Sequence, residues 1–270
     1  MKLVVLVKHV PDEIVDRPSS AAVFAADMTV DRAQLTGRLS EADEYAVEQA
    51  MRIARRRLDV QITAVTMGPP EAIRTLTRAL ALGADEGVHI VDEALHGSDA
   101  QATSRVLAAA LARCGFDLVI CGVASTDSGM SVVPAMVAER LGVPSVCEAD
   151  GVWADPGWAD GDVIVARRED GDHVEDFAVP MPAVVSVTDR VGEPRYPAFQ
   201  AIVEARQKAV RTWSLANLRI PADEVGLAAS ASPVRRVAPH AARRPALLVE
   251  GEPDAAAARL ARYLTEHQLI

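Results

Sequence analysis

The chain before Pro144 alternates short apolar runs with longer stretches in which apolar residues recur every three or four positions. Strands buried on both faces of a parallel sheet are expected at four of the apolar runs: Leu3–Val7, Val60–Met67, Gly87–Val91 and Asp117–Cys121. The stretches between them have the periodicity of helices. This alternation predicts an α/β fold, a doubly wound and mostly parallel sheet with helices on both faces.

Polar pairs and glycines mark where these helices begin and end. Ser40 with Asp43, and Ser98 with Gln101, have the spacing of a capping box, in which side chains bond the first turn of a helix. A further helix is expected at about 131–141. Glycine is favoured just after a helix, and we expect three helices to end at Gly83, near Gly115 and at Gly142.

The pattern changes after Pro144. Val163–Arg168 and Val174–Val179 have the composition of short strands, and Glu169-Asp170-Gly171-Asp172 between them is typical of a hairpin turn. Another apolar run, Ala183–Thr188, follows. We expect these strands to form an antiparallel extension of the sheet.

The C-terminal region has a different composition. Residues 228–246 are rich in Ala, Ser, Pro and Arg and have little apolar periodicity, whereas Asp254–His267 regains a helical stripe. The four arginines of residues 228–246 (Arg235, Arg236, Arg243 and Arg244) form a local basic run, and such runs are usually solvated. These changes predict a main α/β domain over 1–190, a connecting loop and helix over 191–210, and an arm over 211–270.

Composition and charge exclude several classes of protein. The 38 acidic and 28 basic residues leave a formal charge of −10, which opposes the phosphate attraction on which nucleic-acid binding depends. The N-terminus is too short for a signal-peptide core and no apolar run spans a membrane, so we expect a cytoplasmic protein that is not membrane-embedded. Neither the three cysteines nor the six histidines have the spacing of a disulfide framework or metal site.

A series of motifs then follows along the chain. It consists of Val7-Lys8-His9-Val10-Pro11-Asp12, Asp43 to Ala50, Met67-Gly68-Pro69, Arg78 to Asp85, Ser125-Thr126-Asp127 with Ala138 to Pro144, and Met181 to Val187 leading into Glu193-Pro194-Arg195-Tyr196-Pro197-Ala198-Phe199. In this order and spacing the motifs resemble those of electron-transfer flavoprotein beta subunits, strongly over roughly Lys2 to Val210. The fold that this implies, of the adenine nucleotide alpha hydrolase type, agrees with the alternation above.

The resemblance implies partners and cofactors. The beta subunit pairs with a larger alpha subunit that holds most of the FAD, and the heterodimer receives electrons from flavin-dependent dehydrogenases. Many members bind AMP in the beta chain, usually in a structural role, and some relatives bind a second FAD there. No catalytic side chain or metal is required of this chain, because the flavin carries the redox chemistry.

The resemblance also places a nucleotide site where ligands bind in open parallel sheets, outside the carboxyl ends of the strands at the point where strand order reverses. By position its contacts fall on Leu6, Ser40, Glu41, Ala42, Asp43, Met67, Gly122, Val123, Ser125, Thr126, Asp127, Ser128, Gly129, Met130, Ser131, Val132 and Val133. The loop ends at a helix N-terminus, which favours phosphate.

The chain departs from the family pattern in this region. Ser40-Glu41 stands where many members have Asn-Pro, and Ser131-Val132-Val133 stands where they have polar donors for the phosphate. The alternative to a bound nucleotide is a loop without a ligand, in which water or Ser131 as N-cap closes the helix N-terminus.

A partner-docking loop is expected at Arg195, Tyr196, Pro197 and Phe199. Prolines stiffen this segment. The resemblance places Phe199 where well-known members have a Leu that inserts into a pocket of the dehydrogenase. The alternative is that the two aromatic side chains pack onto the body of the protein.

Other functions remain open at this point. A stand-alone adenine-nucleotide sensor of the universal-stress type has the same sheet architecture but would not need the 193–199 segment or the long tail. An ATP-hydrolysing enzyme would need a glycine-rich loop after the first strand, and residues 7–12 contain no glycine. Asp43, Glu44 and Glu48 could form an acid–base pair, but acidic residues near a helix N-terminus are favoured by its dipole without any catalytic role.

Overall fold

The computed structural model describes residues 1–12, 24–32, 36–57, 59–153, 163–238, 248–249 and 251–270. It consists of two compact units, Met1–Val237 and Ala238–Ile270. The second unit contains helix α8 (Pro253–Glu266), none of whose residues is buried. The prediction of a terminal helix over Asp254–His267 is confirmed to within a residue at each end.

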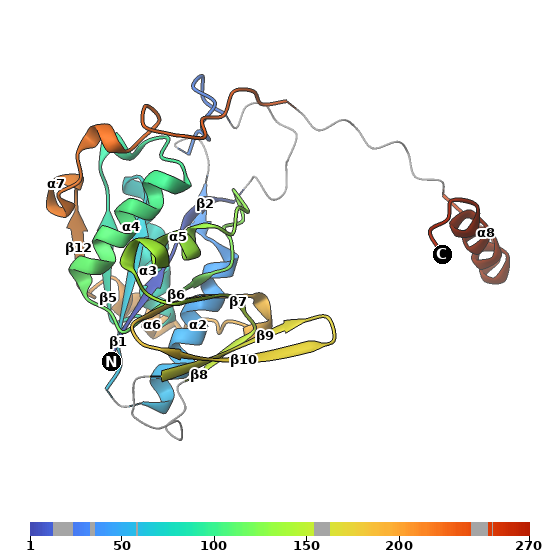
Figure 1. Ribbon diagram of the computed structural model, residues 1–270, viewed down its shortest axis with the longest axis horizontal. Coiled ribbons are helices and arrows are strands. Elements are labelled where there is room, and N and C mark those ends of the chain that lie inside the picture. Colours follow the sequence, from blue (N-terminus) through green and yellow to red (C-terminus); the bar gives the residue numbers. More distant parts are fainter. Residues whose placement is uncertain (13–23, 33–35, 58, 154–162, 239–247, 250) are drawn as a thin grey trace. The chain divides into compact units, whose positions relative to one another are not determined.

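The first unit is built on a seven-stranded parallel sheet (Figure 1). Its strands are β1 (Lys2–Leu6), β4 (Gln61–Met67), β5 (Glu86–Ile90), β6 (Leu118–Gly122), β7 (Ser145–Ala149), β11 (Ala183–Val187) and β12 (Val210–Trp213), in the order β12-β5-β4-β1-β6-β11-β7. Successive strands β4 and β5 lie on one side of β1, and β6 lies on its other side. The order therefore reverses between β1 and β6, which pair directly through Leu3 and Leu118.

Helices cover both faces of the sheet, which confirms the predicted α/β class. The main helices are α2 (Glu41–Arg56), α3 (Ile73–Leu82), α4 (Ala100–Cys114) and α5 (Val133–Leu141). Alternate residues of β1 point to opposite faces. Leu3 packs in the core with α2 and α3, whereas Val4 packs in the core with α4 and α5.

Shorter elements complete the unit. They are β2 (His9–Pro11) and β3 (Gly37–Leu39), which pair antiparallel, together with η2 (Pro70–Ala72), η3 (Glu93–Leu95), η4 (Asp189–Val191), α6 (Phe199–Ala205), α7 (Leu215–Leu218) and η5 (Ala222–Glu224).

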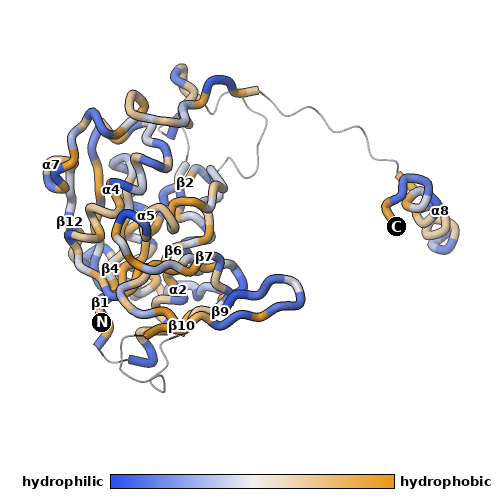
Figure 2. The backbone as a smooth tube through the Cα atoms, viewed as in Figure 1, coloured by the Kyte–Doolittle hydropathy of each residue, from blue (hydrophilic) through white to orange (hydrophobic). Residues whose placement is uncertain are grey.

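The predicted antiparallel extension is wrong in its pairing. β9 (Val163–Asp170) and β10 (His173–Pro180) form the expected hairpin, but they join β8 (Gly151–Trp153) in a separate three-stranded sheet. β11 instead enters the main sheet in parallel, between β6 and β7. All five residues of β11 are buried, as an inner strand requires, whereas β10 is mostly exposed and the hairpin tip is hydrophilic (Figure 2).

The predicted helix ends are right, and so is the start of α2 after Ser40, but the two predicted capping arrangements are wrong. Gly83, Gly115 and Gly142 each follow a helix directly. Helix α4, however, is capped by Asp99, whose carboxylate accepts the N–H of Ala102 at 3.0 Å, and not by Ser98. Helix α2 follows Ser40, but no side chain caps it.

Candidate functional site

The predicted nucleotide residues gather at one edge of the sheet, where β1, β4 and β6 end. Leu6, Met67 and Gly122 are the last residues of these three parallel strands, so their carboxyl ends lie together. The start of α2, at Ser40 to Asp43, and the loop from Gly122 to Val133 meet there. We call these residues the switch-point cluster.

Asp43 holds the two central strands together at this edge. It lies in the first turn of α2, and its carboxylate accepts the N–H of Lys8 at 2.8 Å and that of Gly122 at 3.1 Å. Burial raises the pKa of Asp43 to about 7, although the two backbone hydrogen bonds act in the opposite direction. A Cβ on Gly122 would lie 2.7 Å from both Ala42 and Asp43, so this close approach requires glycine.

Ser40 joins the same edge to the loop that follows β6. Its side chain is fully buried, and its hydroxyl accepts the N–H of Thr126 at 3.4 Å. Its own N–H donates to the carbonyl of Lys8 at 3.0 Å. Ser40 and Asp43, which the sequence presents as a capping pair, therefore bond strand and loop instead of the first turn of α2.

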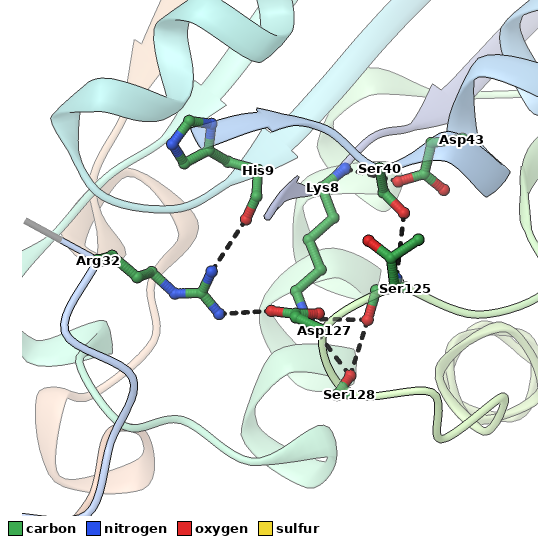
Figure 3. Close-up of polar contacts among 9 residues, drawn as sticks. Lys8, His9, Arg32, Ser40, Asp43, Ser125, Asp127 and Ser128 are labelled. Atoms are coloured by element: carbon green, nitrogen blue, oxygen red, sulfur yellow. Dashed lines mark hydrogen bonds and ion pairs between the residues drawn. The ribbon is translucent and has the colours of Figure 1, made fainter. Parts of the chain in front are cut away.

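Two cations and one carboxylate form the polar centre of the cluster (Figure 3). The Asp127 carboxylate, with only 3% of its side chain exposed, lies 2.7 Å from Lys8 Nζ and 2.7 Å from a guanidinium nitrogen of Arg32. Lys8 Nζ also donates to the Ser125 hydroxyl at 3.0 Å, and this hydroxyl lies 2.7 Å from that of Ser128. Burial alone would raise the pKa of Asp127, but the Lys8 charge and hydrogen bonds from both cations lower it to about 2.

The loop beyond Asp127 runs over the surface to the start of α5. Residues 128 to 132 are exposed, and Gly129 and Ser131 have φ of 59° and 55°. The N-cap of α5 is Val132, which offers no side-chain acceptor, so Ser131 does not cap the helix as one form of the alternative required. Pro134 lacks an N–H, which leaves the amides of Val133 and Ala135 directed out of the helix end.

The remaining members of the predicted set have simpler surroundings. Glu41 is exposed at the first position of α2, and the side chains of Met130 and Val132 are 53% and 38% exposed. The N–H of Val123 donates to the carbonyl of Val187 at 2.9 Å, which extends the pairing of β6 with β11.

The predicted docking residues lie in the connection from η4 to α6. The side chains of Tyr196 and Phe199 are 91% and 82% exposed, so neither ring packs onto the body of this chain. Arg195 points the other way, and its guanidinium donates to the Glu48 carboxylate at 2.6 and 2.7 Å. Pro197 lies between the two aromatic residues in an irregular segment.

Sequence reasoning missed several residues that organise these regions. Lys8 stands in the first motif, so its position after a buried strand could have indicated it. Arg32 had no local signal. Glu48 was interpreted as an ordinary acidic residue of a helix, whereas its side chain is buried against Arg195.

The described residues contain no group of three or more His, Cys, Asp or Glu side chains that could hold a metal ion. Among the same residues, no helix has the length and apolarity needed to cross a membrane.

The fold defines a doubly wound α/β protein, and sequence comparison defines it further. The family model described as electron transfer flavoprotein domain matches residues 27–218. Proteins called electron transfer flavoprotein subunit beta, from Mycobacterium leprae (strain TN) and Mycobacterium bovis (strain ATCC BAA-935 / AF2122/97), are each 35% identical over 273 residues, covering 99% of both chains. The chain belongs to the electron-transfer flavoprotein family, among its beta subunits.

Proposed function

We propose that this chain is the beta half of a heterodimer that carries electrons on FAD from flavin-dependent dehydrogenases to an acceptor. The observation that carries the proposal is the convergence of the ends of β1, β4 and β6 with the starts of α2 and α5 at one edge of the sheet. It gains support from the likeness to beta subunits over almost the whole chain. FAD, held mainly by the alpha subunit, supplies the redox chemistry when bound.

The switch-point cluster is the proposed site of AMP. The start of α5 supports this, because its amides are not capped by a side chain and a helix N-terminus attracts phosphate. The hydroxyls of Thr126, Ser128 and Ser131 lie in or beside the same exposed loop. Asp127 neutralises one of the two positive charges of Lys8 and Arg32. Backbone amides and hydroxyls are expected to bind the phosphate. A second FAD in place of AMP would need room and donors for a pyrophosphate.

The segment over 191–210 is the proposed docking region for dehydrogenases. Tyr196 and Phe199 are large, exposed and next to prolines, which is the arrangement expected of aromatic anchors that a partner pocket buries. Ile202 and Val203, on the helix that Phe199 begins, are 38% and 45% exposed and extend the apolar surface.

The arm over 211–270 is the proposed contact with the alpha subunit. Within the unit Ala238–Ile270, Leu260 and Tyr263 of α8 are 52% and 42% exposed, and no residue of the helix is buried. An amphipathic helix without a buried face gains stability by packing that face on another surface. Residues 1–190 are the proposed α/β domain with the nucleotide site, and the first residues of the arm add β12 to its sheet.

Co-expression with an alpha subunit from the same genome tests the proposal. Gel filtration is expected to give a yellow 1:1 heterodimer, and the flavin-to-protein ratio distinguishes one FAD from two. Mass spectrometry of the denatured complex is expected to release an adenine mononucleotide. A colourless chain that never binds an alpha subunit would contradict the heterodimer, and repeated absence of a nucleotide would contradict the AMP site alone.

A further inference from the structure

Glu48 makes a two-point contact with the segment that bears the exposed aromatic residues. It lies on α2 with 7% of its side chain exposed, and Arg195 donates to its two oxygens from Nε at 2.6 Å and from a terminal nitrogen at 2.7 Å. The backbone N–H of Arg195 also donates to it at 3.4 Å. Such a bidentate pair fixes orientation as well as distance, because the guanidinium and the carboxylate are both planar.

Arg52 extends this contact along the same segment. It lies one turn after Glu48 on α2, and its Nε is 3.3 Å from the Glu48 carboxylate. Its guanidinium donates to the carbonyl of Val191 and, at 3.5 Å, to that of Glu193. Gly192 has a φ of 98°, and a Cβ there would lie 2.8 Å from the Arg52 nitrogens. The backbone of the connecting segment is therefore bound to side chains of α2 at residues 191, 193 and 195.

The Glu48 carboxylate is ionised in this network. Burial alone would raise its pKa, but the hydrogen bonds and charge of Arg195, with the charge of Arg52, hold the pKa of Glu48 below its usual range. One buried anion thus lies between two cations that both reach the connecting segment.

The two aromatic side chains just beyond the network are not held by burial of their own rings, although α6, which begins at Phe199, packs against α3. Tyr196 and Phe199 are almost fully exposed, and α6 begins at Phe199 without a side-chain cap. Burial of these rings therefore cannot set the direction of the segment. Pro197 restricts the backbone between them, so the orientation fixed at Arg195 is passed on to both rings.

We propose that Glu48, together with Arg52 and Arg195, positions the docking loop, residues 191–199, so that Tyr196 and Phe199 meet the dehydrogenase already oriented. This inference rests on the proposed docking function. It changes the role of Arg195, which was predicted as a docking residue: its guanidinium binds inward. A preoriented loop loses less conformational freedom when it binds. Loss of this fixed orientation is therefore expected to weaken binding of the dehydrogenase without altering the flavin.

The test is a set of variants of the complete heterodimer: Glu48→Gln, Arg195→Lys, the Glu48→Gln/Arg195→Lys double variant and Phe199→Ala. Asp176→Asn is the matched control, because Arg167 and Asp176 form a bidentate pair of similar length, 2.8 and 2.8 Å, on the β9–β10 hairpin. Dehydrogenase-driven reduction is measured against heterodimer concentration, well below the melting temperature of each variant. Amide hydrogen exchange of peptides covering 191–199 and α2 is measured in parallel.

Glu48→Gln and Arg195→Lys are each expected to raise KM for the heterodimer about tenfold with little change in kcat. The double variant is expected to raise KM no more than the more strongly affected single variant does, because both changes break the same contact. Exchange is expected to increase in 191–199 and not in α2. Asp176→Asn is expected to change KM less than about twofold.

Three results would overturn the inference. The first is an unchanged KM in both single variants while Phe199→Ala raises KM, and the second is a rise in KM of equal size in Asp176→Asn. The third is faster amide hydrogen exchange throughout α2. If Phe199→Ala also leaves KM unchanged, the docking function itself fails. If Glu48→Gln does not fold, Arg195→Lys decides alone, because it keeps the charge and removes only the two-point geometry.

Discussion

The backbone of Gly122 lies so close to the side chain of Asp43 that a residue with a Cβ does not fit at position 122. The Gly122 N–H donates to the Asp43 carboxylate at 3.1 Å, and a Cβ on Gly122 would lie 2.7 Å from the same carboxylate. The second oxygen accepts the N–H of Lys8. One buried carboxylate thus connects the ends of the two strands between which the sheet order reverses.

Asp43→Asn is expected to lower the free energy of unfolding of the full chain by about 1–3 kcal/mol, because the amide keeps one acceptor oxygen and its NH₂ cannot accept the second backbone N–H. Urea unfolding at neutral pH measures this. Glu41→Gln, an exposed change two positions earlier in α2, is the control and is expected to have an effect below about 0.5 kcal/mol. Equal effects of the two substitutions would show that the strand contacts contribute little.

Asp127→Asn is expected to cost about 2 kcal/mol of stability, because it leaves Lys8 and Arg32 without their shared anion. Breaking a fully buried ion pair would cost more, but Lys8 and Arg32 are partly exposed, so water can solvate their charges. Asp176→Asn breaks an exposed bidentate pair and is expected to cost less than about 1 kcal/mol.

The Asp127 contribution is also expected to depend on pH. Its folded pKa is lowered to about 2, so the stabilisation is present above the unfolded pKa of about 4 and is lost as pH falls from there through 2. The difference in stability between the parent chain and Asp127→Asn is therefore expected to be constant from pH 5 to 8 and to shrink below about pH 4. A difference that grows on acidification would contradict this sign.

Phe199→Ala is expected to leave the free energy of unfolding unchanged within about 0.5 kcal/mol, because the ring is 82% exposed. If a dehydrogenase buries the ring, KM for the heterodimer is expected to rise about 30-fold, the equivalent of about 2 kcal/mol. Val174→Ala removes another exposed apolar side chain, on β10, and serves as the control for KM. A fall in stability with no change in KM would make Phe199 a structural residue.

Ending the chain after Val237 is expected to separate folding from assembly. The cut removes α8, none of whose residues is buried, and keeps the contacts of Asp99 with the backbone of Ala231 and Ser232. The urea midpoint of the shortened chain is expected to match that of the full chain, while dissociation of the heterodimer becomes faster. A heterodimer of undiminished stability would exclude residues 238–270 of the arm from the interface.

The inner strands could be predicted from sequence and the two edge strands could not, for a physical reason. β1, β4, β5 and β6 are largely buried and consist mostly of apolar residues. β7 contains Glu148 and β12 contains Arg211 and Thr212, because edge strands such as β7 and β12 can expose part of their length to water. Neither of these produced a recognisable pattern.

The gathering of the candidate-site residues was predictable, and their bonding was not. Resemblance placed the switch-point residues on one edge of the sheet, and the structure brings them together there. The short-range patterns, however, were misleading, because Ser40 and Asp43 bond Thr126, Lys8 and Gly122 instead of their own helix. The pair of Glu48 and Arg195 spans 147 positions, and no local spacing indicates such a contact.

The path of the chain from β11 to β12 has a further consequence. Four strands lie between these two in the sheet, so their ends are separated by about 24 Å at the usual spacing of strands. The intervening residues include the docking loop and α6, which packs against α3. This connection links the inner strand β11 to the edge strand β12 across the sheet. A dehydrogenase that binds its middle would therefore resist fraying of β12 from β5, and partner binding would slow local opening at an edge that the partner never touches.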